Sequence, residues 1–448
     1  MPFFFMPLSL FTKEYISGVL TLPLILICSI LIFRFFKGER NFYIHPYVAC
    51  LVSVLVLIQA IINYHAGHKF IDYDSWKHFF QFIKIVILVF INYFFIRQTI
   101  TTRKHIIQFL QGTFIFLGMA FLVGFMQEIY LKTGQLTGLI SFIGRSLEAQ
   151  WPKTSSFYQK GSYVQTIPRI NGLSQEPSIF ASQIGVLSFP LLLSLIKNQF
   201  NLFFKSPKKN IAFYIVVFLL TTLLSILIKS TSGLILVVLA WGFLFLIIFN
   251  NKNKKVQLTI FSTLMLALIA LIFIYFGNPR IQSFLNEYLV QKLQNNSGVN
   301  RTAISLGLFK IFLHHPIFGV GFSGPYLFYA TIGNVKNNPE FITFFLADKY
   351  LPQLSELGQY LANYGLIVIA PVLYYFGKIK INFLQLNRHK LTKDKLIPVI
   401  NDMMTYFFIF FIISQISVIR TVNSCYLFTL FLFPTALAIL KKQTALKE

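Results

Sequence analysis

The sequence has few acids and few charged residues of either sign. Asp and Glu together account for 14 of its 448 residues, and all charged residues make up 12% of the chain. Soluble globular proteins have about 25% charged and about 45–50% apolar residues. Here the hydrophobic fraction is 56%, and apolar runs of nearly 20 residues recur from end to end. The composition excludes a soluble enzyme, a disordered scaffold and a coiled coil, and it predicts a polytopic membrane protein.

Several signatures of common chemistries are also missing. The three cysteines lie in apolar runs without a CxxC pair or an adjacent histidine, which argues against a disulfide framework or a zinc site. There is no P-loop, HExxH or GxSxG motif, and the GxGxxG at 319–324 follows no predicted strand. Asp72 and Asp74 come nearest to an acidic metal pair, although a solvated loop is the simpler explanation of them. We therefore expect no metal and no cofactor.

Eleven apolar runs are long enough to be membrane spans, within a range of 10 to 14 that allows for ambiguous ends. Their approximate bounds are 16–36, 46–64, 79–97, 106–130, 177–197, 211–228, 233–249, 257–277, 357–377, 403–419 and 423–440. Every backbone polar group in lipid must be bonded within the protein, so each run is expected to be helical. The predicted fold class is all-α, with residues 1–448 forming a single polytopic membrane domain.

Basic residues are distributed unevenly between the loops. The formal net charge is +25, which in a soluble protein would suggest nucleic-acid binding. Here 21 Lys and Arg residues fall in one set of alternate loops and 5 in the opposite short segments. The positive-inside rule then places the first set in the cytoplasm. This predicts an N-terminus on the outer side and a cytoplasmic C-terminus, and it leaves no role for nucleic acid.

Two long segments, 131–176 and 278–356, then fall on the outer side. Both contain many aromatic residues and neither is of low complexity. Long loops of this kind are usually functional when they are ordered. We expect them to contain short amphipathic helices, with 278–356 forming a lid over an outward-facing active-site cavity. The apolar N-terminal stretch 1–11 is too short to span and is expected to lie at the membrane interface or to extend the first helix.

The first outer segment ends in a turn-rich stretch that holds Arg169 and Glu176 and leads directly into a span at Pro177. Proline suits the first turn of a helix, where its missing N–H costs nothing, so Glu176 would lie beside the positive end of that helix. One interpretation is a capped helix start with an arginine at the membrane surface. The other is a site for an anionic lipid headgroup, since the planar guanidinium binds phosphate through two hydrogen bonds.

The second outer segment has a turn-like cluster at 295–301, ending on Arg301, and then an amphipathic stretch at 302–313. Apolar residues at 304, 308, 311 and 312 repeat at helical spacing. His314, His315 and Pro316 end this stretch, and adjacent histidines on a helix point to different faces. Capping of the helix is the simpler explanation of this pair, and a metal site is a poor fit.

A polar stripe marks the return to the membrane. Glu356, Gln359, Tyr360 and Asn363 are spaced to share one helical face. Such a stripe either faces a wet cavity or makes hydrogen bonds inside the helix bundle. Glu356 and the nearby Asp348 are candidates for a general base, because a carboxylate can accept the proton of a hydroxyl group. Gln415 and Arg420 add polar groups near the same predicted face.

Three stretches give the sequence a family resemblance. They are RINGLSQEPSIFA at 169–181, NSGVNRTAISLGLFKIFLHHPIFGVGFSG at 296–324, and LSELGQYLANYGLIVIAPVL at 354–373. The sequence resembles the O-antigen polymerase (Wzy-type) and O-antigen ligase superfamily of bacterial inner membranes. The resemblance implies a GT-C-like, metal-independent glycosyltransferase whose donor is a glycan on undecaprenyl pyrophosphate. It further implies a bacterial inner-membrane location, with the outer side and the N-terminus in the periplasm, and that Arg169 and Arg301 bind the pyrophosphate. The polar residues Gln359, Tyr360 and Arg420 near the same face are candidates for contacts with other parts of the substrates.

One departure from the family pattern bears on the acceptor. Ligases of this superfamily usually have a histidine at the start of the return helix, whereas this chain has Leu354-Ser355-Glu356. The resemblance therefore favours a polymerase, with Glu356, then Glu176, then His314 as candidate bases. The expected partners are the lipid-linked oligosaccharide as donor and acceptor, the lipid bilayer and a chain-length regulator protein. A ligase using another acceptor stays open, as does a non-enzymatic flippase for lipid-linked oligosaccharides.

Overall fold

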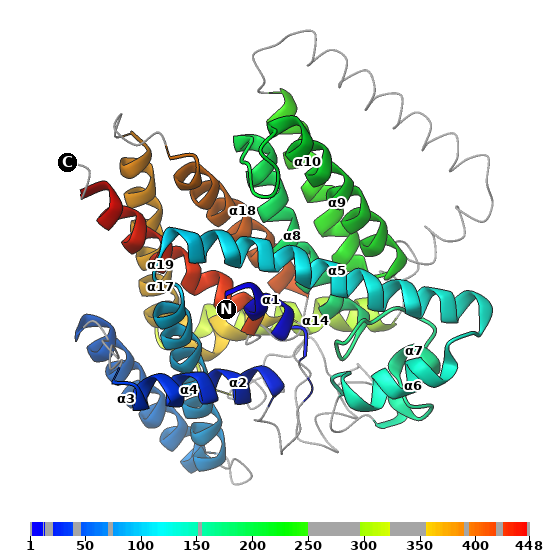
Figure 1. The fold of residues 1–448 in the computed structure, drawn as a ribbon. Coiled ribbons are helices and arrows are strands. Elements are labelled where there is room, and N and C mark those ends of the chain that lie inside the picture. The colour runs from blue at the N-terminus through cyan, green and yellow to red at the C-terminus, as the bar shows by residue number, and fades with distance from the viewer. Residues whose placement is uncertain are drawn as a thin grey trace.

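The computed structural model describes residues 2–11, 13, 21–38, 46–69, 75–150, 155–249, 296–322, 355–388, 394–417 and 424–445. The helices connected by loops and turns in these residues, with no strand among them, confirm the predicted all-α class (Figure 1). The elements are η1 (Pro2–Phe4), α1 (Phe5–Leu8), α2 (Leu22–Phe36), α3 (Pro46–Lys69), α4 (Ser75–Thr99), α5 (Arg103–Thr133), α6 (Thr137–Ser146), η2 (Ser155–Tyr158), α7 (Tyr163–Thr166), α8 (Pro177–Asn198), α9 (Pro207–Leu227), α10 (Thr231–Phe249), α14 (Asn296–His314), α17 (Glu356–Arg388), α18 (Leu396–Ser417) and α19 (Ser424–Ala445).

Eight helices in the described part are long and apolar enough to cross a membrane. They are α4, α5, α8, α9, α10, α17, α18 and α19. The first two predicted spans coincide with α2 and α3, whose apolar stretches Leu24–Phe36 and Val52–His65 are shorter. The predicted span at 257–277 lies outside the described residues. A polytopic membrane protein is thus confirmed, and the count of eleven spans stays a prediction.

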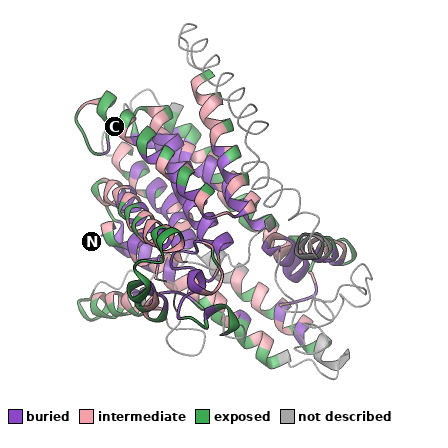
Figure 2. Cartoon of the chain, turned by 90° about the vertical axis from the view of Figure 1, so that its right-hand side faces the viewer, coloured by how far each residue is buried: buried purple, intermediate pink, exposed green. Residues whose placement is uncertain are grey.

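Helix α8 lies at the centre of the bundle. It is largely apolar and almost entirely buried, and it packs against α18, α10, α9 and α5. Buried residues gather in the interior of the helix bundle (Figure 2). A helix that is apolar all round is expected in the interior of a large bundle. Its Phe189 ring lies 5.3 Å from Phe218 of α9 and 6.0 Å from Phe410 of α18, measured between ring centroids. The start of α8 is therefore held rigidly, and with it the stretch that contains Arg169 and Glu176.

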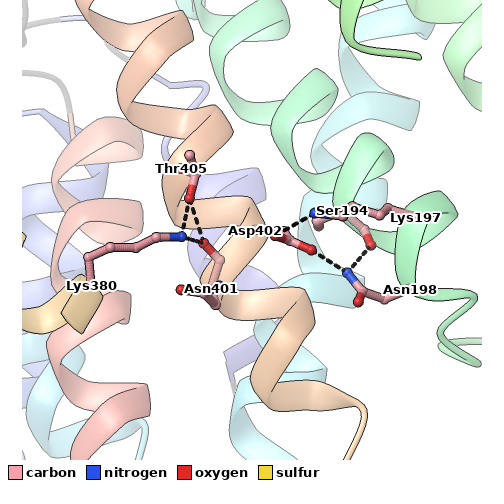
Figure 3. Close-up of polar contacts among 7 residues, drawn as sticks. All are labelled: Ser194, Lys197, Asn198, Lys380, Asn401, Asp402 and Thr405. Carbon is pink, nitrogen blue, oxygen red and sulfur yellow. Dashed lines mark hydrogen bonds and ion pairs between the residues drawn. The ribbon is translucent and has the colours of Figure 1, made fainter. Parts of the chain in front are cut away.

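Polar contacts join the helix ends that the charge pattern assigns to the cytoplasm. Asp402 of α18 accepts hydrogen bonds from Lys197 (2.9 Å) and Asn198 (2.8 Å) at the end of α8 (Figure 3). In the same region Lys380 of α17 donates to the hydroxyl of Thr405 on α18 (Figure 3). These contacts place the ends of α8 and α17 beside the start of α18, as the alternating topology requires.

The opposite helix ends also contact one another. Gln127, near the end of α5, donates to the side-chain oxygen of Asn171 at 3.1 Å. Arg169 donates to the backbone carbonyl of Lys229, which lies between α9 and α10. Ends predicted to lie outside thus pair with each other. We propose that this face is periplasmic, on the strength of the basic residues that gather at the other face.

The N-terminal stretch packs against α5 and ends well before α2, which corrects the expectation that it extends the first helix, whereas its place at the membrane interface stays a prediction. Elements η1 and α1 lie across α5, where a Cβ added to Gly112 would overlap the carbonyl oxygen of Phe3. Phe5 and Met6 are buried, and the Phe5 ring is 4.5 Å from that of Phe95 in α4. The missing side chain at Gly112 lets the backbone approach the helix closely.

A second correction concerns the turn expected at 295–301. Residues 296–301 form the first turns of α14, which continues to His314. The predicted apolar stripe is confirmed, since Ile304, Leu308 and Ile311 are fully buried. Asn, Ser and Gly have weak helical propensities, but a weak propensity does not forbid a helix, and α14 extends back through these residues.

Candidate functional site

Helices α14 and α17 run side by side in the same direction. Near the start of α17, a Cβ added to Gly358 would lie 3.2 Å from the Cβ of Leu308. Farther along, the backbone N–H of Leu366 donates to the carbonyl of Pro316 at 2.8 Å. The sequence offset is the same at both contacts, so the pairing is parallel. Glu356 therefore begins α17 beside the middle of α14, within about two turns of Arg301 along the helix axis.

Helix α17 is broken at Gly365, where φ is 60° and ψ is −166°. The loop formed by residues 315–322 docks against this break. The loop donates from the N–H groups of Val320 and Gly321 to the carbonyls of Ala362 (2.8 Å) and Asn363 (2.9 Å). In return, α17 donates from the N–H groups of Leu366 and Ile367 to the carbonyls of Pro316 (2.8 Å) and Ile317 (3.0 Å). A broken membrane helix is tolerated where other protein groups bond the freed backbone, and the 315–322 loop does so here.

Two glycines allow this docking. A Cβ on Gly319 would lie 2.5 Å from the backbone of Asn363, and a Cβ on Gly365 would overlap the carbonyl oxygen of Ile317. Both glycines have positive φ, at 68° and 60°. The P-x-x-G-x-G stretch thus holds the broken helix in place through its backbone. From α3, the side-chain oxygen of Gln59 accepts the N–H of Phe322 at 3.1 Å and supports the loop from the other side.

The predicted polar stripe occupies the half of α17 before the break. Glu356, Gln359 and Asn363 are 6%, 8% and 1% exposed, and Tyr360 donates to Glu356 Oε1 at 2.9 Å. Gln359 Oε1 is buried without a hydrogen-bond donor among the described residues. Buried amide oxygens normally have partners, so this oxygen is available to a hydroxyl group of a ligand or to water.

Arg169 is held at the turn between α9 and α10. Its Nη2 donates to the Lys229 carbonyl at 2.6 Å, and its Nε is buried with no acceptor in the part of the chain that the structure describes. The backbone of Lys229 has a φ of 56° at this turn. The hydrogen bond therefore places Arg169 beside a second cationic residue. The guanidinium is anchored at one nitrogen and has donor capacity left at another, as an anion site requires.

Glu176 occupies the N-cap position of α8, and Pro177 is the first helical residue, as predicted. The Ser178 hydroxyl donates to the Glu176 carboxylate. A carboxylate at this end is stabilised by the helix dipole, which explains Glu176 as a structural residue.

Sequence reasoning missed Glu148, which is fully buried in the first outer segment. Its Oε2 accepts from the Ser162 hydroxyl at 2.5 Å. Its Oε1 accepts from the Tyr163 N–H at 2.9 Å and from the Asn171 side chain at 2.8 Å. Gln127 of α5 bonds the same asparagine and the backbone of Gly172. Glu148 thus ties three parts of the segment together, and its partner Asn171 lies two residues after Arg169 in the chain.

Burial raises the pKa of Glu148 to about 7, against the opposing effect of its three hydrogen bonds and of Lys13. Lys13 itself has a pKa lowered by burial and raised in part by Glu148. The carboxyl is therefore poised to change protonation near neutral pH, with the cation and three donors favouring its ionised form.

Comparison with known protein families finds a match. Residues 216–373 match the family model described as O-antigen ligase. This region, about a third of the chain, is similar to that family. The predicted resemblance to the O-antigen polymerase and ligase superfamily is confirmed. No curated protein matches the chain.

The matched region contains most of the predicted site residues. It covers Arg301, His314, the 315–322 loop and the stripe that starts at Glu356, whereas Glu148 and Arg169 precede it. His314 is exposed and lies beside the break in α17, at the far end of α14 from Arg301.

Several predicted residues lie outside the described part. These are Asp72, Asp74, Asp348, Arg420 and most of the 278–356 lid. Arg301 is placed on α14 by its backbone, so its meeting with Arg169 stays a prediction. Within the residues that the structure describes, no group of three or more His, Cys, Asp or Glu side chains could hold a metal ion.

Proposed function

We propose that the protein polymerises the lipid-linked repeat units of O-antigen or a related surface polysaccharide. It would transfer the growing glycan from undecaprenyl pyrophosphate to a sugar hydroxyl of another lipid-linked repeat unit. The observation that carries the proposal is the match to the O-antigen ligase family, because the matched region contains the α14–α17 pair and the buried Gln359 Oε1, which has no donor among the described residues. The superfamily comprises glycan transferases, which favours an enzyme over a flippase.

Arg169 and Arg301 would bind the pyrophosphate of the donor. The buried Nε of Arg169 has no acceptor in the described residues, and a phosphate oxygen would satisfy it. Two guanidinium groups would meet the negative charge that grows on the pyrophosphate as the glycosidic bond breaks. The leaving group is activated already, so the proposal needs neither a nucleotide nor a metal ion.

Glu356 would act as general base on the acceptor. The acceptor hydroxyl oxygen forms a bond to the anomeric carbon while the bond from that carbon to the pyrophosphate oxygen breaks. The hydroxyl proton passes to the Glu356 carboxylate, and undecaprenyl pyrophosphate leaves with the electron pair. The buried amide oxygen of Gln359 could accept a hydrogen bond from another sugar hydroxyl and so orient the acceptor.

The residue at the start of α17 supports a polymerase rather than a ligase. Glu356 occupies the region where ligases of the superfamily usually have a histidine. Transfer to a different acceptor, as in a ligase, differs only in the identity of the attacking hydroxyl.

Reconstitution tests the proposal. The purified protein in liposomes is given one lipid-linked repeat unit, EDTA and no nucleotide sugar, and the products are separated on a gel. We expect a ladder of glycans on the lipid, and we expect Glu356→Gln to abolish it. Transfer of the glycan only when an acceptor other than the lipid-linked repeat unit is added would show a ligase. Lipid translocation without any new glycosidic bond would show a flippase.

A further inference from the structure

A cavity of about 580 Å³ opens between α4, α17 and α19, away from the proposed catalytic residues. Arg97 and Lys442 line it together with the hydroxyl-bearing Tyr93, Thr101 and Tyr375. These residues lie at the helix ends that the charge pattern assigns to the cytoplasm. Part of α19, including Pro434 and Ile439, gives the cavity an apolar wall. The cavity thus joins two cations to an apolar surface at one edge of the bundle.

Arg97 is held in a fixed position. Its Nη1 donates to the Tyr93 hydroxyl at 2.6 Å, and the guanidinium lies 5.8 Å from the centre of the same ring. An aromatic face and a hydroxyl together restrict the side chain, which lowers the entropy lost when it binds an anion.

The surroundings add positive charge. Lys378 lies 5.7 Å from the ring centre of Tyr374, which is 69% exposed, and Lys441 donates to Asn382 at 3.0 Å. Exposed tyrosines beside lysines are typical of the membrane–water interface.

Acids nearby do little to offset that charge. In the described part of this end of the bundle the acids are Asp394 and Asp402. Asp394 bonds Arg103 at 2.9 Å, and Asp402 bonds Lys197 at 2.9 Å. The cavity therefore lies in a cationic region whose acids already have cationic partners.

We propose that this cavity binds the headgroup of an anionic phospholipid from the cytoplasmic leaflet. Basic pockets between membrane helices on that side suit phosphate-bearing headgroups, and the apolar wall would contact the upper part of the acyl chains. Free phosphate shares the anionic chemistry but would gain nothing from the apolar wall. The lipid would join α4, α17 and α19 at their inner ends, whatever glycan the protein acts on.

Lys442→Gln and Arg97→Gln test the site, with Lys441→Gln as the matched control. Lys441 is the neighbouring exposed lysine, and it bonds Asn382 and does not line the cavity. Binding of phosphatidylglycerol and phosphatidylcholine to the purified protein is measured by native mass spectrometry. Inorganic phosphate at the same ionic strength is the third arm.

We expect preferential retention of phosphatidylglycerol, reduced about fivefold by Lys442→Gln and less than about twofold by Lys441→Gln. Arg97→Gln repeats the loss at a second position, and a thermal-unfolding curve confirms that each variant is folded. Equal retention of phosphatidylcholine, or equal losses in the 441 and 442 variants, would overturn the proposal. Displacement of the lipid by equimolar phosphate would show a free-anion site instead.

Discussion

Glu148 shows how one buried residue can organise a loop. It accepts hydrogen bonds from Ser162, Tyr163 and Asn171, and this brings together positions up to 23 residues apart. Its carboxylate is thus a structural centre for the segment that contains Arg169.

Substitution of Glu148 separates its shape from its charge. Glu148→Gln keeps an oxygen for the Tyr163 and Asn171 donors and offers an N–H to the Ser162 hydroxyl, so it should fold normally. Glu148→Ala leaves buried donors without an acceptor, which costs about 1–3 kcal/mol for each. Thermal unfolding in detergent should show a clearly lower melting temperature for Glu148→Ala and little change for Glu148→Gln. Equal losses would mean that the cluster needs the negative charge.

The raised pKa of Glu148 also predicts a pH dependence. Below pH 4.5 both the native and unfolded states hold the proton, and between pH 4.5 and about 7 only the native state keeps it. The free energy of unfolding should therefore fall as pH rises through this window, by up to about 3 kcal/mol, and level off above it. Melting curves at pH 5 and pH 8 should show this fall in the wild type and lose it in Glu148→Gln.

Glu356 carries the prediction closest to the chemistry. Glu356→Gln keeps the shape and can still accept from Tyr360, but it removes the basicity. General-base catalysis is worth about 10²–10⁴-fold, so elongation should nearly disappear while donor binding persists. Tyr360→Phe removes only the hydrogen bond to Glu356, so it should reduce elongation less than Glu356→Gln does. Normal chain length in Glu356→Gln would reject Glu356, and Glu176 and then His314 would be tested next.

At the scale of the element, the break in α17 is the main feature. The 315–322 loop and the two halves of α17 fit together through backbone contacts that leave no room for a Cβ at Gly365. The polar stripe ends two residues before this break, so its position depends on the fit.

Gly365→Ala should therefore damage both folding and activity. The added Cβ would overlap the Ile317 carbonyl, and the positive φ is strained for alanine. Gly377→Ala in the same helix is the matched control, since a Cβ added there would have no other atom within 4 Å. We expect a lower melting temperature and loss of elongation for the first variant and wild-type behaviour for the second. Wild-type behaviour of both would show that the loop does not hold the helix.

The elements differ in how far the sequence determines them. Long apolar runs predicted α4, α5, α8, α9, α10, α17, α18 and α19, because the cost of unpaired backbone groups in lipid leaves few alternatives. The break at Gly365 was not predictable, since the apolar pattern continues through it and the break depends on a loop far along the chain. The turn expected at 295–301 was wrong because the weak helical propensities of Asn, Ser and Gly are a poor guide to where a helix begins, and α14 includes residues 296–301.

The candidate site divides in the same way. Helical spacing identified the buried stripe of Glu356, Gln359 and Asn363, since periodicity survives folding unchanged. Glu148 depends on partners from three separate stretches, so spacing carried no signal for it. The sequence offered one clue to Glu148, which is that acidic residues are rare in this apolar chain. The same clue drew attention to Glu356.

At the scale of the whole molecule, polar residues gather at both ends of an apolar bundle. Ion pairs and lysines join the helices at one end, and the clusters around Glu148 and Arg169 lie at the other. This arrangement fits a membrane enzyme whose chemistry takes place at one face while the opposite face is anchored by charge.

The shared pyrophosphate site is tested most directly by the distance between positions 169 and 301. Spin labels at the two positions, measured by pulsed electron resonance in liposomes, report it without any assay of activity. We expect a separation of roughly 15 Å, the reach of two arginine side chains to one pyrophosphate. A separation of roughly twice that value would contradict the shared site.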